Sequence, residues 1–105
     1  MILKYNLEIE ENAIKANLKR ITNQIYKLLP NREEGVDWET PLTTIMEELA
    51  GMDRLFTDQQ ESLFSILCKL EGLFILTDEK DFFLYRRTIF ECLSLMNSIM
   101  QECLV

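Results

Sequence analysis

Paired carboxylates are the side chains whose type and spacing come closest to catalytic or metal-binding chemistry in this sequence. Adjacent acidic residues occur at Glu33-Glu34 and at Glu47-Glu48, and carboxylates that project inward from facing helices can hold a pair of metal ions. The apolar pattern around both pairs directs them outward instead. The chain also contains no histidine, which is the commonest general base and metal ligand. We therefore expect no enzyme activity, no metal site and no cofactor.

The three cysteines are the next candidates for chemistry. Cys68, Cys92 and Cys103 each stand among apolar residues at helical spacing, and none has the spacing of zinc ligands or a histidine beside it. Cys92 and Cys103 are three helical turns apart, which is too far for a disulfide along a straight helix. A free cysteine behaves mostly as a small hydrophobic residue. We expect reduced thiols buried in the core, with an intermolecular disulfide or a redox role as the alternative.

An arginine pair, Arg86-Arg87, interrupts the most apolar part of the sequence. One of these arginines can pair with Glu91, or with acidic residues earlier in the chain, while its aliphatic stem covers apolar surface. Alternatively, the pair is a docking point for a carboxylate or phosphate of a partner, because the planar guanidinium matches both groups.

The net charge of −7 is unevenly distributed along the chain. Residues 12–32 contain five basic side chains and no acidic one, whereas residues 33–61 contain nine acidic side chains and a single arginine. Nucleic acids and anionic membranes attract basic patches, so we expect neither to bind directly. Attraction between the basic and acidic segments within the molecule accounts for the pattern.

The acidic segment 33–61 also allows a more specific interpretation. A row of surface carboxylates can imitate the phosphate backbone and occupy a nucleic-acid-binding surface on another protein. Small acidic proteins of phages and mobile elements inhibit defence complexes in this way, and the present chain resembles them in size and charge only.

The element that must position these residues is the apolar segment 78–104. Its apolar residues fall into two neighbouring stripes at helical spacing, so its apolar face is wide enough to contact two or more neighbours. We therefore predict a long C-terminal helix at the centre of a helical bundle. The first stripe contains Phe82, Tyr85, Ile89, Cys92, Met96, Ile99 and Cys103, and the second contains Phe83, Phe90, Leu93, Met100 and Leu104.

Three shorter helices are predicted before this segment. The first covers 10–29 and ends at Pro30, the second begins at Thr40-Pro41, and the third begins near Asp58 with a capping box. Trp38 lies in the connection 31–40, where it either caps the end of the bundle or anchors a partner. The predicted buried faces are Ile14, Leu18, Ile21, Ile25 and Leu28, then Leu42, Ile45, Met46, Leu49 and Met52, then Leu63, Phe64, Ile66, Leu67, Leu70, Leu73 and Phe74.

The N-terminal segment carries a different pattern. Leu3, Tyr5, Leu7 and Ile9 alternate with polar residues, which is typical of a half-buried strand. No later segment alternates comparably, so such a strand would have to pair with a second copy or with another protein. The alternative is an extended arm or an early helical turn that packs on the bundle.

These observations predict one all-α domain over residues 1–105, a small four-helix bundle with a long C-terminal helix and a short N-terminal segment. The longest apolar run, 73–76, is far shorter than the roughly 20 residues of a membrane span. The N-terminal residues do not have the pattern of a signal peptide. We therefore expect a cytoplasmic protein without membrane contact.

The function expected from the sequence is non-catalytic protein binding, as an adaptor or assembly subunit, with another protein or a second copy as partner. The alternative is the acidic inhibitor described above. The candidate partner-binding residues are Trp38, Glu33, Glu34, Asp37, Glu47, Glu48, Arg86 and Arg87, and the candidate self-association residues are Leu3, Tyr5, Leu7 and Ile9.

Overall fold

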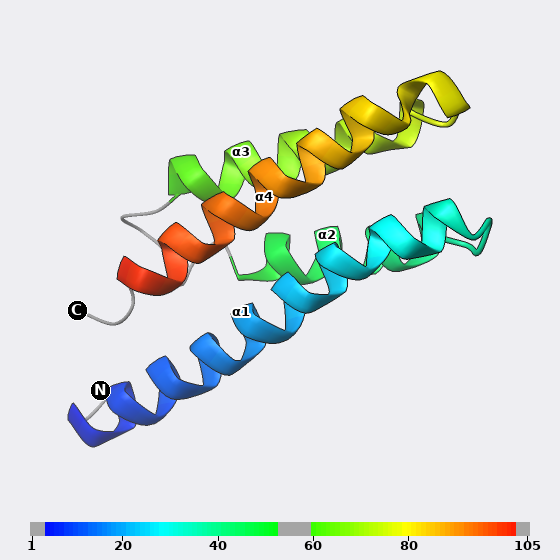
Figure 1. Ribbon diagram of the computed structural model, residues 1–105. Coiled ribbons are helices and arrows are strands. Elements are labelled where there is room, and N and C mark those ends of the chain that lie inside the picture. Colours follow the sequence, from blue (N-terminus) through cyan, green and yellow to red (C-terminus); the bar gives the residue numbers. More distant parts are fainter. Residues whose placement is uncertain (1–3, 53–59, 103–105) are drawn as a thin grey trace.

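The computed structural model describes residues 4–52 and 60–102, and the side chains of residues 12–52 and 61–101. Within these residues the chain forms four α-helices and no strand, so the predicted all-α bundle with a long C-terminal helix is confirmed. Successive helices run antiparallel, and the α1–α2 and α3–α4 connections lie at the same end (Figure 1). The elements are α1 (Lys4–Glu33), α2 (Glu39–Gly51), α3 (Gln60–Gly72), the short 3-10 turns η2 (Leu73–Ile75) and η3 (Glu79–Asp81), and α4 (Phe82–Glu102).

The helices form an elongated bundle in which each one packs against two others. Helix α1 contacts α2 and α4, and α3 contacts the same two helices from the other side. The molecule measures 51 × 23 × 19 Å. At 1.5 Å per residue, α1 is about 45 Å long, whereas α2 and α3 are each about 20 Å long. The two short helices therefore cover only part of the long α1–α4 pair.

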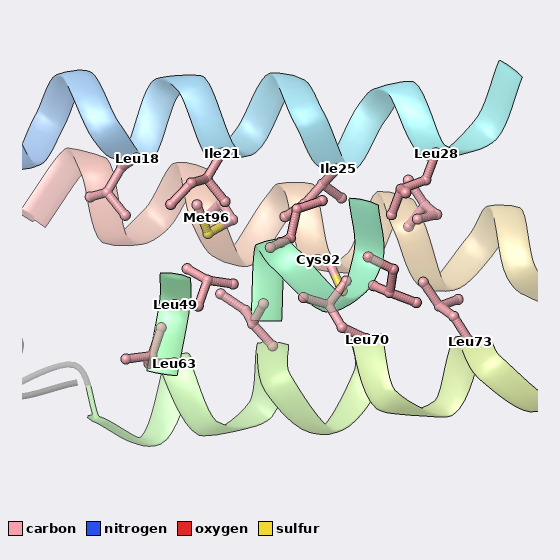
Figure 2. Close-up of a cluster of buried hydrophobic side chains, with 14 of the residues drawn as sticks. Leu18, Ile21, Ile25, Leu28, Leu49, Leu63, Leu70, Leu73, Cys92 and Met96 are labelled. Carbon is pink, nitrogen blue, oxygen red and sulfur yellow. The ribbon is translucent and has the colours of Figure 1, made fainter. Parts of the chain in front are cut away.

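The core is built from one narrow apolar stripe on each helix (Figure 2). The stripes follow the three-and-four spacing predicted from the sequence, and no polar or charged side chain in the described part is buried among them. Burying an aliphatic side chain of this size contributes about 1.5–3 kcal/mol, so these contacts dominate the stability of the bundle. The buried residues are Leu18, Ile21, Ile25, Leu28, Leu29, Leu42, Ile45, Leu49, Leu63, Ile66, Leu70, Leu73, Tyr85, Ile89, Cys92, Met96 and Ile99.

Of the two interpretations of the N-terminal segment, the strand is wrong, and the early helical turn agrees with the structure over residues 4–9. Residues 4–9, including Tyr5, Leu7 and Ile9, form the first turns of α1, and Leu3 lies outside the described residues. A lone strand leaves its backbone groups without partners, whereas a helix satisfies them within the segment. Leu7 also stands seven residues before Ile14, so it continues the helical spacing of the rest of α1.

Helix α1 also continues past Pro30, where the sequence predicted its end. It runs on to Glu33, because proline removes only one hydrogen bond, from its own nitrogen to the carbonyl of Tyr26. Both residues are exposed, so water can satisfy that carbonyl.

The end of α1 depends on Gly35. Its backbone φ of +73° is the single positive φ value in the described residues. The N–H of Gly35 donates to the carbonyl of Arg32 at 3.2 Å, and the N–H of Val36 donates to that of Asn31 at 2.8 Å. This pair of bonds is the Schellman motif, which requires a left-handed residue at the position of Gly35.

Helix α2 begins earlier than predicted because Asp37, rather than Thr40, caps it. The Oδ1 atom of Asp37 accepts the N–H groups of Glu39 at 3.0 Å and of Thr40 at 3.2 Å. Hydrogen bonding to Thr40 holds the pKa of the Asp37 carboxyl below its ordinary value. Pro41 then falls within the first turn, where its missing N–H has no intrahelical partner to lose.

Arg32 joins the end of α1 to the connection between η2 and η3. Its Nε and Nη2 atoms donate to the carbonyl of Leu76 at 3.2 and 2.7 Å, and Nη2 also donates to the carbonyl of Asp78 at 2.8 Å. The guanidinium lies 5.2 Å from the ring centre of Phe82 and 4.8 Å from that of Tyr85. A single planar cation thus satisfies two backbone carbonyls that follow a helical turn and covers two aromatic rings.

We predict that Gly35→Ala destabilises the protein by about 1 kcal/mol, because an alanine at positive φ is strained. Gly72→Ala is the matched control, since Gly72 has a helical φ of −61° and should gain about 0.5–1 kcal/mol. An added Cβ meets no atom within 4 Å at either position, so the difference comes from the backbone alone. Urea unfolding measures both free energies, and equal effects of the two substitutions would contradict the assigned helix end.

We predict that Arg32→Lys destabilises the protein by about 1–3 kcal/mol, because a lysine keeps the charge but cannot serve both carbonyls. Thermal unfolding should show a midpoint lower by about 5 °C or more. Arg20→Lys is the control, because Arg20 is an exposed residue whose ion pair with Glu48 lies in solvent. The interpretation fails if the two variants unfold at the same temperature.

Candidate functional site

The described residues offer no cluster of side chains that could hold a metal ion. No group of three Asp, Glu or Cys side chains in the described parts of the chain is placed to hold a metal ion. No described helix is long and apolar enough to span a membrane. The unusual features of the surface are instead its exposed aromatic side chains.

Three phenylalanines that the sequence placed on buried faces lie on the surface. Phe64 is 67% exposed, Phe83 is 77% exposed and Phe90 is 44% exposed. Each helix buries only the stripe that contacts its two neighbours, and these three residues lie beside that stripe rather than on it. The predicted second stripe of the C-terminal helix is therefore not part of the core at these positions. Exposed aromatic side chains of this kind mark surfaces that contact other molecules.

An apolar groove runs between α2 and α3. It has a volume of about 550 Å³, and its apolar lining comes from Met46 and Ala50 on one side and Phe64, Leu67 and Phe74 on the other. Each of these residues directly follows a core residue in the sequence, so each lies about 100° further round its helix. Two such second stripes, one on each helix, form the walls of the groove.

Two carboxylates stand on opposite walls of the groove. Glu47 projects from α2 and Glu71 from α3, and both line the groove and are exposed. Among the side chains that the structure describes, neither takes part in an ion pair. Glu48, the other acidic residue of the predicted pair, faces α1 and bonds to Arg20. The predicted pair is thus divided, with Glu47 at the groove and Glu48 in an intramolecular bridge.

The outer face of α4 carries the second cluster of exposed aromatic side chains. A shallow hollow of about 420 Å³ is lined by Phe83, Arg86, Arg87 and Phe90, and by the carboxylate side chain of Glu91. The guanidinium of Arg86 lies 5.2 Å from the ring centre of Phe90. Arg87 approaches Glu91 at 3.8 Å, which is one of the two arrangements expected from the sequence. We call these four residues, 83, 86, 87 and 90, the outer face of α4.

Trp38 lies at the end of the bundle, partly buried against other aromatic rings. Its ring is 5.1 Å from that of Tyr85 in an edge-to-face arrangement and 6.4 Å from that of Phe74. Tyr85 is fully buried, and burial raises the pKa of its hydroxyl. Its hydroxyl is 3.5 Å from the carbonyl of Leu28, which makes only a weak hydrogen bond. Trp38 therefore covers the end of the core and also packs against Phe74, which lines the groove.

The remaining candidate residues are dispersed. Glu33 and Glu34 are exposed at the end of α1, and Asp37 is occupied as the cap of α2. The side chains of Tyr5, Leu7 and Ile9 lie outside the described set. Sequence reasoning missed the groove itself. The signal that would have revealed it is the apolar residue that follows most of the core residues on the second and third helices.

The two described cysteines differ in their exposure to solvent, although the sequence predicted that all the cysteines are buried. Cys92 is fully buried in the core, whereas Cys68 is exposed in the groove, and Cys103 lies outside the described residues. Burial raises the pKa of the Cys92 thiol to about 12, with the nearby Lys69 opposing this effect. Only the thiolate is strongly nucleophilic, so Cys92 should be inert at neutral pH.

We predict that Cys68 reacts with a thiol reagent in the native protein and that Cys92 does not. The measurement uses 5,5′-dithiobis(2-nitrobenzoic acid) at pH 8 on the Cys103→Ser variant, with Cys68→Ser added as a control. One thiol should react at once, and the second should react only on unfolding. Fast native reaction of the variant that retains Cys92 alone would contradict the described core.

Comparisons with known proteins identify no relative of this chain. No family model matches the chain, and no curated protein or solved structure is significantly similar to it.

Proposed function

We propose that this chain is a non-catalytic protein-binding module whose α2–α3 groove accepts a helical segment with apolar anchors and basic flanks. The observation that carries the proposal is the groove itself, open to solvent, apolar along its walls and bordered by the carboxylates of Glu47 and Glu71. Grooves of this kind bind amphipathic helices through apolar contacts, while opposite charges at the rim select the partner.

The placement of the acidic segment supports this function over the acidic inhibitor. Asp37 caps α2 and Glu48 bonds to Arg20, so two of the predicted carboxylates already have partners within the molecule. Glu47 stands beside apolar side chains rather than in a row of carboxylates. A phosphate mimic requires a continuous acidic face, whereas a binding module requires an exposed apolar surface with a charged rim.

The test uses two designed helical peptides with the same apolar stripe, one with lysine and arginine flanks and the other with glutamate flanks. The basic peptide should bind about three- to tenfold more tightly, because exposed ion pairs each contribute about 0.2–1 kcal/mol. It should shift the amide NMR signals of residues 43–50 and 64–74. Added salt should reduce the preference between the peptides without abolishing binding, since the apolar contacts remain.

The variant Glu47→Lys/Glu71→Lys should reverse the preference between the two peptides. Glu33→Lys/Glu34→Lys is the matched control, because it makes the same change in net charge at exposed positions outside the groove. The proposal is overturned if neither peptide perturbs the groove signals, or if the control variant reverses the preference as well.

A further inference from the structure

We infer that the groove binds the outer face of α4 from a second copy of this chain, so that copies associate head to tail. This inference rests on the proposed function, because it names the partner for the same groove. It joins two exposed surfaces that carry apolar side chains, the α2–α3 groove and the outer face of α4.

The outer face of α4 has the residue spacing of a helix that docks in a groove. Phe83 and Phe90 occupy positions i and i+7, which are two of the anchor positions of helix-in-groove recognition, and Arg86 and Arg87 stand between them at i+3 and i+4. The two phenylalanines, one at each end of this pattern, are largely exposed in the single chain. Aromatic and arginine side chains are also those most enriched at the centres of protein interfaces.

The dimensions of the two surfaces agree. Seven residues of helix separate Phe83 from Phe90, a rise of about 10 Å. The lining of the groove runs from Thr43 to Ala50 on α2, about 10 Å, and from Phe64 to Phe74 on the other wall, about 15 Å. Both phenylalanines can therefore lie in the groove at the same time.

The charges of the two surfaces are complementary. The outer face of α4 carries Arg86 and Arg87, with Glu91 beside them already paired with Lys69 and Arg87, and the groove carries Glu47 and Glu71. Arg87 is free to change partner, because its contact with Glu91 is long, at 3.8 Å, and its side chain is 71% exposed. Opposite charges fix the register of such an interface and exclude partners of like charge.

The two surfaces of one molecule cannot meet each other. Helix α4 packs against α1 and α3, and Lys69 of α3 bonds to Glu91 of α4 at 3.3 Å, next to the outer face. The groove lies on the other side of α3, between α3 and α2. A second copy must therefore supply the helix, and each copy keeps one surface available for a third.

This arrangement is heterologous, so it produces rings or open chains rather than a closed two-fold dimer. Two phenylalanines bury only about 300–500 Å² between them, and interfaces below about 1,200 Å² are weak. Association should therefore depend strongly on protein concentration.

The test is sedimentation equilibrium over a wide range of concentrations. The native chain should show a mass that rises above that of one chain. Two variants reverse the charge of one surface each, Arg86→Glu/Arg87→Glu and Glu47→Lys/Glu71→Lys. Copies of either variant should associate with one another at least about tenfold more weakly than native copies do, because the two contacting surfaces then carry like charges. An equal mixture of the two variants should regain association, since each contact between unlike variants again joins opposite charges.

Two further variants control for net charge. Lys27→Glu/Lys80→Glu has the same net charge as the arginine variant, and Glu33→Lys/Glu34→Lys has that of the glutamate variant, all at exposed positions. Both controls should associate like the native chain. Alkylation of Cys68, which lines the groove, should slow as the native chain associates, and should not slow in the arginine variant.

The outcomes separate this inference from the proposed function. If the native chain remains a monomer at every concentration while the basic peptide still shifts the groove signals, the second copy is not the partner and the proposed function stands. If the chain associates but the charge variants associate equally, or their mixture regains nothing, another surface is responsible and the inference is wrong. If the peptide also fails to bind, both are wrong.

Discussion

The contact on which this molecule depends is the packing of one narrow stripe of α4 against α1 and α3. Tyr85, Ile89, Cys92, Met96 and Ile99 are all fully or almost fully buried along this stripe. Because each described helix packs mainly against two others, a single stripe at three-and-four spacing satisfies the core. Helices α3 and α4 nevertheless carry more apolar surface than this stripe uses. This additional apolar surface is not buried inside the bundle. It contributes to the groove and to the outer face of α4.

The contacts of Arg32 at the end of the bundle help to keep the additional apolar side chains on the surface. Arg32 holds the connection at Leu76 and Asp78 against the end of α1, and its guanidinium covers Phe82 and Tyr85. These contacts link the end of α1 to the start of α4. If α3 or α4 turned to bury an exposed phenylalanine, fully buried core residues would become exposed. Since close-packed cores resist such changes, the exposed aromatic surface belongs to the stable fold.

The sequence was sufficient for the fold class and for the core stripes, because periodicity reports directly which residues share a helix face. It was insufficient where two residues next to each other were both apolar. Periodicity placed Phe64, Phe83 and Phe90 in the core, since it does not reveal how many neighbours a helix has. Helix ends were misplaced for a related reason. Pro30 stays within α1 and Asp37 caps α2, and both outcomes depend on exposure and loop geometry, which a linear pattern does not contain.

The charge distribution constrains how the surplus apolar surface can act. A net charge of −7 makes copies of the chain repel one another at long range, which protects an exposed aromatic surface from non-specific aggregation. Only a contact that places basic against acidic side chains overcomes this repulsion locally. Within the described surface, the outer face of α4 combines two arginines with two exposed phenylalanines, and the groove combines two carboxylates with apolar walls. The charge distribution therefore favours apolar contacts in which the two surfaces carry opposite charges.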